Sequence, residues 1–62
     1  MSYLLIKVGS ERDNDVVFND PSVSPHHLEI FVDVEGNAFA TDLGSEYGTF
    51  LNGERISDSV EL

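Results

Sequence analysis

Apolar and polar residues alternate along most of the chain, which is the pattern of β-strands. Leu28, Ile30, Val32 and Val34 are separated by single residues and would share one face only in an extended strand. Further runs of this kind occupy residues 3–8, 15–18, 38–43, 49–51 and 54–56. Because β-branched and aromatic residues dominate these runs and helical spacing is missing between them, the pattern predicts an all-β fold.

Turn residues separate the predicted strands. Asn52-Gly53 predicts a type I′ hairpin turn, because Asn and Gly best tolerate the positive φ that this turn needs at both central positions. Glu35-Gly36-Asn37 predicts a second tight connection, between the strands at 28–34 and 38–43.

Three polar segments are predicted to form loops. Pro21 and Pro25 have no amide hydrogen for a central ladder, so we expect a loop over residues 19–26, with others over 9–14 and 44–48. Polar loops on a rigid sheet are typical of a recognition module. The spacing of the short strands favours a β-sandwich.

Composition limits the classes of partner. The 62 residues allow one small domain, and 12 acidic against 3 basic residues give a formal net charge of -9. This charge argues against binding duplex nucleic acid or an anionic membrane surface. The absence of cysteine from the sequence excludes disulfides and Cys-based zinc sites. With neither a spanning segment nor a signal peptide predicted, we expect a cytoplasmic protein without cofactors.

Several short motifs follow one another in a family-specific order. They are Val-Gly at 8–9, Asn-Asp-Val-Val-Phe at 14–18, Ser-Pro-His-His at 24–27, Asp-Leu-Gly-Ser at 42–45 and Gly-Thr-Phe-Leu-Asn-Gly at 48–53. Together they resemble the forkhead-associated (FHA) domain, whose signature contains G-R, N-D, S-x-x-H and D-L-G-S-x-N-G-T-x-x-N-G. The resemblance implies an FHA-like β-sandwich of the SMAD/FHA type that binds phosphothreonine peptides through loops at one end. It also implies that residues 1–62 form one partial domain, incomplete at the C-terminus.

The resemblance identifies four candidate phosphopeptide-binding positions. Ser24 keeps the serine whose hydroxyl donates to phosphate in the family, but Ser10 stands where the family has a phosphate-binding arginine. Tyr47 stands where the family has an asparagine that holds the peptide backbone. Arg12 is the basic residue closest in sequence to the vacated arginine position. The positions that match as loop scaffold are Gly9, His27, Gly48 and Asn52, and in the family the histidine steadies the serine loop.

The charges near these positions oppose phosphate binding. A phosphothreonine carries about −1.5 to −2 charges and needs charged donors, best supplied by arginine. Glu46 follows the third loop's serine, Glu11 and Asp13 flank Arg12, and Pro25 has no amide hydrogen to donate. We therefore expect a protein-interaction module of a signalling or assembly protein with weakened or lost phosphothreonine binding.

Two alternatives stay open. The first is a working phosphothreonine reader in which Arg12 and Ser24 bind a phosphoprotein partner. The second is a structural or oligomerisation domain, including a homodimer, that assembles through an open sheet edge, because unpaired strand edges recruit other chains.

Catalytic and metal-binding interpretations are weaker. Ser24, His27 and Asp42 have the residue types of a hydrolase triad, but the G-x-S-x-G elbow is missing, so we expect no enzyme. His26 and His27 are adjacent and would point to opposite faces of an extended segment, which disfavours a shared metal. The acidic run at 13–15 lacks the glycine and bidentate glutamate of an EF-hand.

Overall fold

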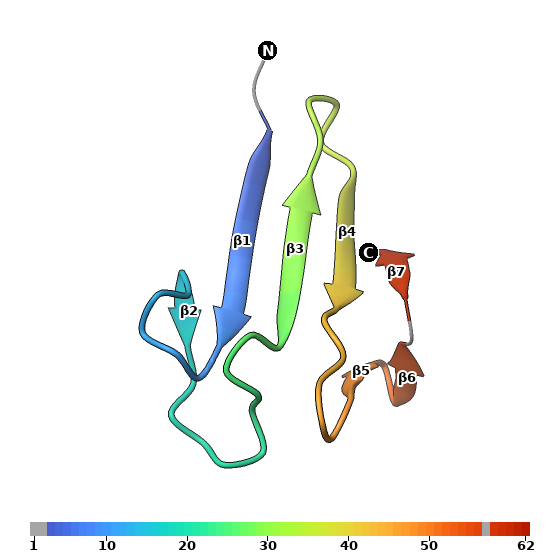
Figure 1. The fold of residues 1–62 in the computed structure, drawn as a ribbon. Helices are drawn as coiled ribbons and strands as arrows, with labels where there is room; N and C mark the ends of the chain where they lie inside the picture. Colours follow the sequence, from blue (N-terminus) through green and yellow to red (C-terminus); the bar gives the residue numbers. More distant parts are fainter. Residues whose placement is uncertain (1–2, 57) are drawn as a thin grey trace.

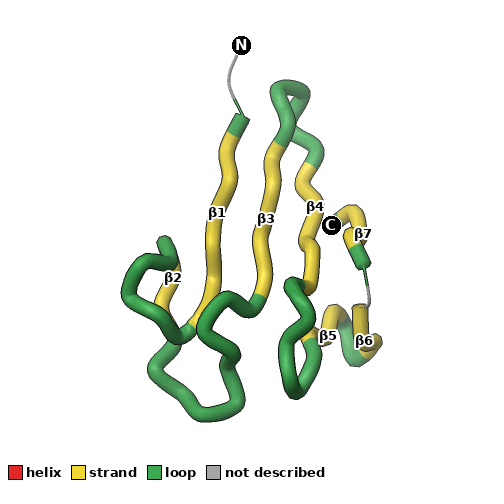
Figure 2. The backbone as a smooth tube through the Cα atoms, in the orientation of Figure 1, coloured by secondary structure: helices red, strands yellow, loops and turns green. Residues whose placement is uncertain are grey.

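The computed structural model describes residues 3–56 and 58–62, which form β-strands joined by loops (Figures 1 and 2). The strands are β1 (Leu4–Gly9), β2 (Val16–Val17), β3 (Leu28–Val32), β4 (Ala38–Asp42), β5 (Thr49–Leu51), β6 (Glu54–Ile56) and β7 (Ser59–Glu61). No helix occurs in this part of the chain, and so none that could cross a membrane. The prediction of an all-β fold is confirmed.

The strands form two sheets. The larger has the order β2-β1-β3-β4-β7, with β1 and β2 parallel and the other pairs antiparallel. The smaller is the β5–β6 hairpin, which follows the loop after β4 (Figure 1). The loops after β2 and β4 lie at the end of the sheet opposite the β3–β4 turn (Figure 2). Polar loops are therefore gathered at one end of a strand framework.

The two faces of the large sheet differ in polarity. Ile6, Ile30, Ala40 and Val60 are register partners across four strands and form an aliphatic row on one face. The opposite face carries aromatic and polar side chains, because strand neighbours alternate between faces. Among the described residues, the buried hydrophobic side chains are Val8, Ala40 and Ile56. The aliphatic face is therefore only partly covered.

Strand β3 is shorter than the alternation predicts. The Oδ1 atom of Asp33 accepts hydrogen bonds from the amides of Glu35 and Asn37, both at 2.9 Å. This local turn ends the strand at Val32, and Val34 lies in the turn with 56% of its surface exposed. The prediction that Val34 continues the buried face is wrong, because the aspartate side chain competes with the strand for the backbone amides.

Other strand boundaries also shift. Strand β2 covers two of the four residues predicted at 15–18, β1 ends one residue later than predicted, and β4 ends one residue earlier. Strand β7 was not predicted, because a three-residue segment with one apolar side chain gives no alternation. Its pairing with β4 places Val60 opposite Ala40 and thereby extends the aliphatic face.

The predicted hairpin turn between β5 and β6 is confirmed. Both central residues have positive φ, 51° at Asn52 and 84° at Gly53, as a type I′ turn requires. The turn places Phe50 opposite Arg55 in the β5–β6 register.

Gly9 is required by a close approach between loops, which gives a test of the fold. A Cβ at Gly9 would lie 2.1 Å from the Pro25 carbonyl oxygen and 2.8 Å from Nδ2 of Asn14. We expect Gly9→Ala to lower the free energy of unfolding by about 3 kcal/mol or to prevent folding, because backbone cannot move aside cheaply. Urea titration followed by circular dichroism measures this.

Gly36→Ala is the matched control. Gly36 has a φ of 90° but nothing within 4 Å of its Cβ position, so the substitution costs only the backbone strain of about 1–2 kcal/mol. A Gly9→Ala variant at least as stable as Gly36→Ala would contradict the close approach.

Candidate functional site

Backbone hydrogen bonds join the first loop, between β1 and β2, to the second loop, between β2 and β3. The Ser10 amide donates to the Ser24 carbonyl oxygen at 3.0 Å, and the Glu11 amide donates to the Pro25 carbonyl oxygen at 3.2 Å. These bonds continue beyond the end of the β1–β3 pairing. Ser10 is therefore a direct neighbour of Ser24, although the two residues are far apart in sequence.

Asn14 secures the same junction from inside the first loop. Its Nδ2 donates to the carbonyl oxygens of Glu11 and Pro25, at 2.8 and 2.7 Å. The side chain is buried, and its Oδ1 has no hydrogen-bond partner among the described residues. The sequence motif contained Asn14, but its role in joining two loops depends on a carbonyl from a distant segment and could not be derived from it.

His27 connects the second loop to the third loop, between β4 and β5. The ring is buried; its Nδ1 accepts a hydrogen bond from the Ser24 amide at 3.1 Å, and its Nε2 lies 3.0 Å from the Gly48 carbonyl oxygen. Since an amide only donates and a carbonyl only accepts, these partners assign the proton to Nε2. The imidazole thus fixes both loop backbones.

The hydroxyl of Ser24 lies where the three loops meet. Its Oγ accepts a hydrogen bond from the Glu46 amide at 3.1 Å, while its own backbone holds Ser10 and His27. Because that amide occupies only an acceptor position, the hydroxyl hydrogen is free to donate to a ligand. The side chain of Glu46, the residue that provides this amide, is exposed.

Asp42 organises the third loop from the end of β4. Its Oδ2 accepts from the amides of Gly44 and Ser45 at 3.0 and 3.1 Å, and its Oδ1 accepts from the hydroxyls of Ser45 and Thr49 at 2.5 and 2.7 Å. Burial raises the pKa of Asp42, but the hydrogen bonds from Ser45, Thr49 and Gly44 outweigh it and lower the pKa to about 2. The carboxylate is therefore a structural acceptor.

Ser24, His27 and Asp42 do not form the hydrogen-bond chain of a hydrolase triad. His27 accepts from the backbone amide of Ser24, not from its hydroxyl, and its other nitrogen bonds a carbonyl. The carboxylate of Asp42 accepts from its own loop. Nucleophile, base and acid are thus each engaged elsewhere.

An exposed ion pair links the first two loops at their outer edge. Nε2 of His26 lies 3.2 Å from both carboxylate oxygens of Asp13. The hydrogen bond from His26 is the main cause that lowers the pKa of Asp13. No cluster of three or more His, Cys, Asp or Glu residues suited to a metal occurs within residues 3–56 and 58–62.

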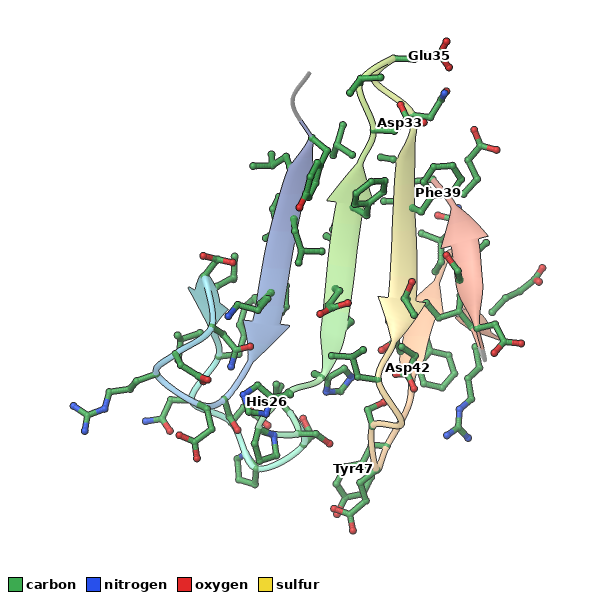
Figure 3. The ribbon with its side chains drawn as sticks, turned by 45° about the horizontal axis from the view of Figure 1, so that its top comes forward. His26, Asp33, Glu35, Phe39, Asp42 and Tyr47 are labelled. Carbon is green, nitrogen blue, oxygen red and sulfur yellow. The ribbon has the colours of Figure 1, made fainter. Side chains whose placement is uncertain are left out.

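The remaining candidate residues from the sequence, Tyr47, Arg12 and Asn52, make fewer contacts. Tyr47 lies at the tip of the third loop, at the same end of the molecule as His26 (Figure 3), with 60% of its surface exposed. Arg12 is exposed and forms no hydrogen bond or ion pair with the described residues. Asn52 lies in the β5–β6 turn and likewise makes no side-chain hydrogen bond in the part of the chain described.

Arg55 is a functional candidate that the sequence did not identify. A Cβ at Gly48 would lie 2.6 Å from Nε of Arg55 and 3.0 Å from its Cζ, so the guanidinium lies directly across the glycine. The sequence places Arg55 beyond a turn, and only the hairpin pairing brings it back to the third loop.

Acid unfolding tests the role of Asp42. Because its pKa in the folded state is below the ordinary value of 3.8, its ionised form stabilises the fold above about pH 4, and that contribution is lost as pH falls toward 2. We expect Asp42→Asn to lower stability at neutral pH and to flatten the pH dependence between 4 and 2. Urea titrations over that pH range measure both effects.

Glu35→Gln removes one negative charge at the opposite end of the sheet (Figure 3) and serves as the control. An Asp42→Asn variant with the same acid profile as Glu35→Gln would contradict the structural role of this carboxylate.

Comparison with known proteins agrees with this arrangement of loops. The family model of the FHA domain matches residues 6–62. The transcriptional regulatory protein EmbR of Mycobacterium tuberculosis is 38% identical over 56 residues, which are 90% of this chain and 14% of EmbR. The chain thus spans about one seventh of that relative's length.

Solved structures show the same backbone. EmbR of Mycobacterium tuberculosis in complex with a low affinity phosphopeptide superposes with a TM-score of 0.85 at 38% identity, over 94% of this chain and 15% of EmbR. The FHA domain of CT664 from Chlamydia trachomatis superposes with a TM-score of 0.90 at 30% identity, over 95% of this chain and 59% of that one. The FhaA FHA domain complexed with the intracellular domain of Rv3910 superposes at 0.86 and 29% identity, over 100% and 66% of the two chains.

Proposed function

The chain belongs to the FHA family, and from that premise we propose that it is a protein-interaction module whose phosphothreonine site is weakened. One observation carries the proposal: the Ser10 amide donates to the Ser24 carbonyl oxygen at 3.0 Å. The position that lacks the family's arginine is therefore a backbone neighbour of Ser24. A short, uncharged side chain there cannot provide the paired charged donors that a phosphate needs.

The charges around Ser24 support the same conclusion. The Glu46 amide donates to the Ser24 hydroxyl, so a residue with a negatively charged side chain directly contacts this serine through its backbone. Glu11 and Asp13 contribute two more carboxylates from the first loop. At physiological salt charges interact over about 8 Å, so these nearby groups matter more than the distant ones.

The relatives support a protein partner. One solved relative holds a low affinity phosphopeptide, and another is complexed with an intracellular domain of a second protein. The proposed role is binding, not catalysis, and the partner is a protein or phosphoprotein.

Restoring the missing arginine tests the proposal. By calorimetry we expect phosphothreonine peptides to bind the native chain weakly or not at all, and Ser10→Arg to bind them at least tenfold more tightly. Charge-assisted hydrogen bonds contribute about 1.5–3 kcal/mol, and about 1.4 kcal/mol is a tenfold change. Ser10→Gln, which adds length without charge, is the matched control and should give little gain.

The variant Arg12→Ala distinguishes this proposal from the alternative, in which Arg12 and Ser24 form a working phosphothreonine site. Micromolar binding by the native chain that needs the phosphate and is lost in Arg12→Ala would show that Arg12 replaces the family's arginine and would overturn the proposal.

Assembly through the sheet is a second candidate function, favoured by the partly covered aliphatic face. Leu4 lies on that face with 55% of its surface exposed. An apolar hollow of about 260 Å³ is lined by Val8, Phe18, Val23, His27 and Leu28, and the register partners Val8 and Leu28 lie on the same face as Leu4. Exposed apolar surface of this kind marks interaction sites.

Light scattering on the 62-residue chain tests assembly. We expect the average mass to rise above the 6.8 kDa of one copy as concentration increases, and Leu4→Glu to suppress the rise. Leu5→Glu places the same charge on the opposite face and is the control. A constant monomer mass over a wide concentration range would exclude this candidate.

A further inference from the structure

Two exposed side chains form a surface patch on the β5–β6 hairpin. Phe50 exposes 61% of its surface, and Arg55 is exposed as well. They are register partners, so they lie side by side on one face of the hairpin. Ile56, the next residue after Arg55, turns to the opposite face and is buried. We call Phe50 and Arg55 the hairpin patch.

The side chain of Arg55 lies against the third loop. It crosses Gly48, where the absence of a side chain makes room for it. The Gly48 carbonyl oxygen lies 3.0 Å from Nε2 of His27, so the backbone beneath Arg55 is joined to the second loop.

The guanidinium also has no carboxylate partner in the described part of the chain. The ion pair found within residues 3–56 and 58–62 joins His26 to Asp13. The planar donors of Arg55 are suited to a carboxylate supplied from outside.

We propose that the hairpin patch binds an extended segment of a partner protein that carries one carboxylate beside a bulky aliphatic side chain. The carboxylate accepts hydrogen bonds from Arg55, and the aliphatic side chain packs on Phe50. Phenylalanine and arginine are among the types enriched in protein interfaces. The net charge of the chain restricts the segment to few acidic residues, because a strongly acidic one would be repelled.

This inference rests on the proposed role as a protein-interaction module, but not on the state of the phosphate site. The two surfaces are tested by different ligands: phosphothreonine peptides report on Ser24, and unphosphorylated peptides report on the hairpin patch. Each proposal can therefore fail while the other stands.

The test is an array of eight-residue peptides, each with one Asp or Glu flanked by Leu, Ile or Val, applied to the 62-residue chain. The tightest binder is then titrated by calorimetry and by ¹H–¹⁵N NMR. We expect shifts at residues 47–55, at least tenfold weaker binding for Arg55→Ala and for Phe50→Ala, and a smaller loss for Arg55→Lys. The fingerprint spectrum shows whether each variant keeps its fold.

Two controls complete the design. Lys7→Ala removes the same charge from β1, in the other sheet, and should bind as the native chain does. The peptide with Asn or Gln in place of its acidic residue should lose most of its affinity.

Several outcomes would overturn the proposal. They are no binder in the array at millimolar peptide, equal binding of the amide peptide, and equal losses for Arg55→Ala and Lys7→Ala. A phosphothreonine peptide that shifts Arg55 and loses affinity in Arg55→Ala would assign the patch to phosphate recognition instead.

Discussion

The buried imidazole of His27 determines how the polar loops are arranged, because its two nitrogens bond backbone groups of different loops. Nδ1 accepts from the Ser24 amide and Nε2 lies against the Gly48 carbonyl oxygen. Only a neutral histidine with the proton on Nε2 satisfies both partners at once. His27 therefore fixes the position of Ser24 relative to the glycine beneath Arg55, together with the hydrogen bond from the Glu46 amide to the Ser24 hydroxyl.

Because the hydrophobic core is small, polar contacts also stabilise this arrangement of the loops. A domain of this length buries only about 60% of the surface of its unfolded chain, so each satisfied polar group matters. Asp42 accepts four hydrogen bonds within the third loop, and Asn14 binds carbonyl oxygens of two loops. Gly9 permits the first two loops to touch. The binding end is thus ordered mainly by hydrogen bonds, and the aliphatic face of the sheet remains partly open.

Sequence reasoning succeeded where local stereochemistry decides the structure. Alternation identified β1, β3 and β4, and Asn52-Gly53 predicted a turn with positive φ at both residues. It failed where a side chain competes with strand pairing for backbone amides, because Asp33 ends β3 before Val34. It also failed for β7, whose strand structure depends on pairing with the edge of β4. For the site, the order of the motifs located the loops. The hydrogen bonds by which Asn14 joins two loops and the approach of Arg55 to Gly48 depend on partners far along the chain.

By itself the sequence determined the strand class, the hairpin turn and the family motifs, because each is a property of residue type or of near neighbours. Tertiary structure alone decided which loops meet and which charged groups face them. The bond from His27 to Gly48 spans 21 residues, and Arg55 reaches the third loop only after the hairpin folds back. Such contacts depend on how strands pair in space, and that pairing cannot be read directly from the spacing of residues along the chain.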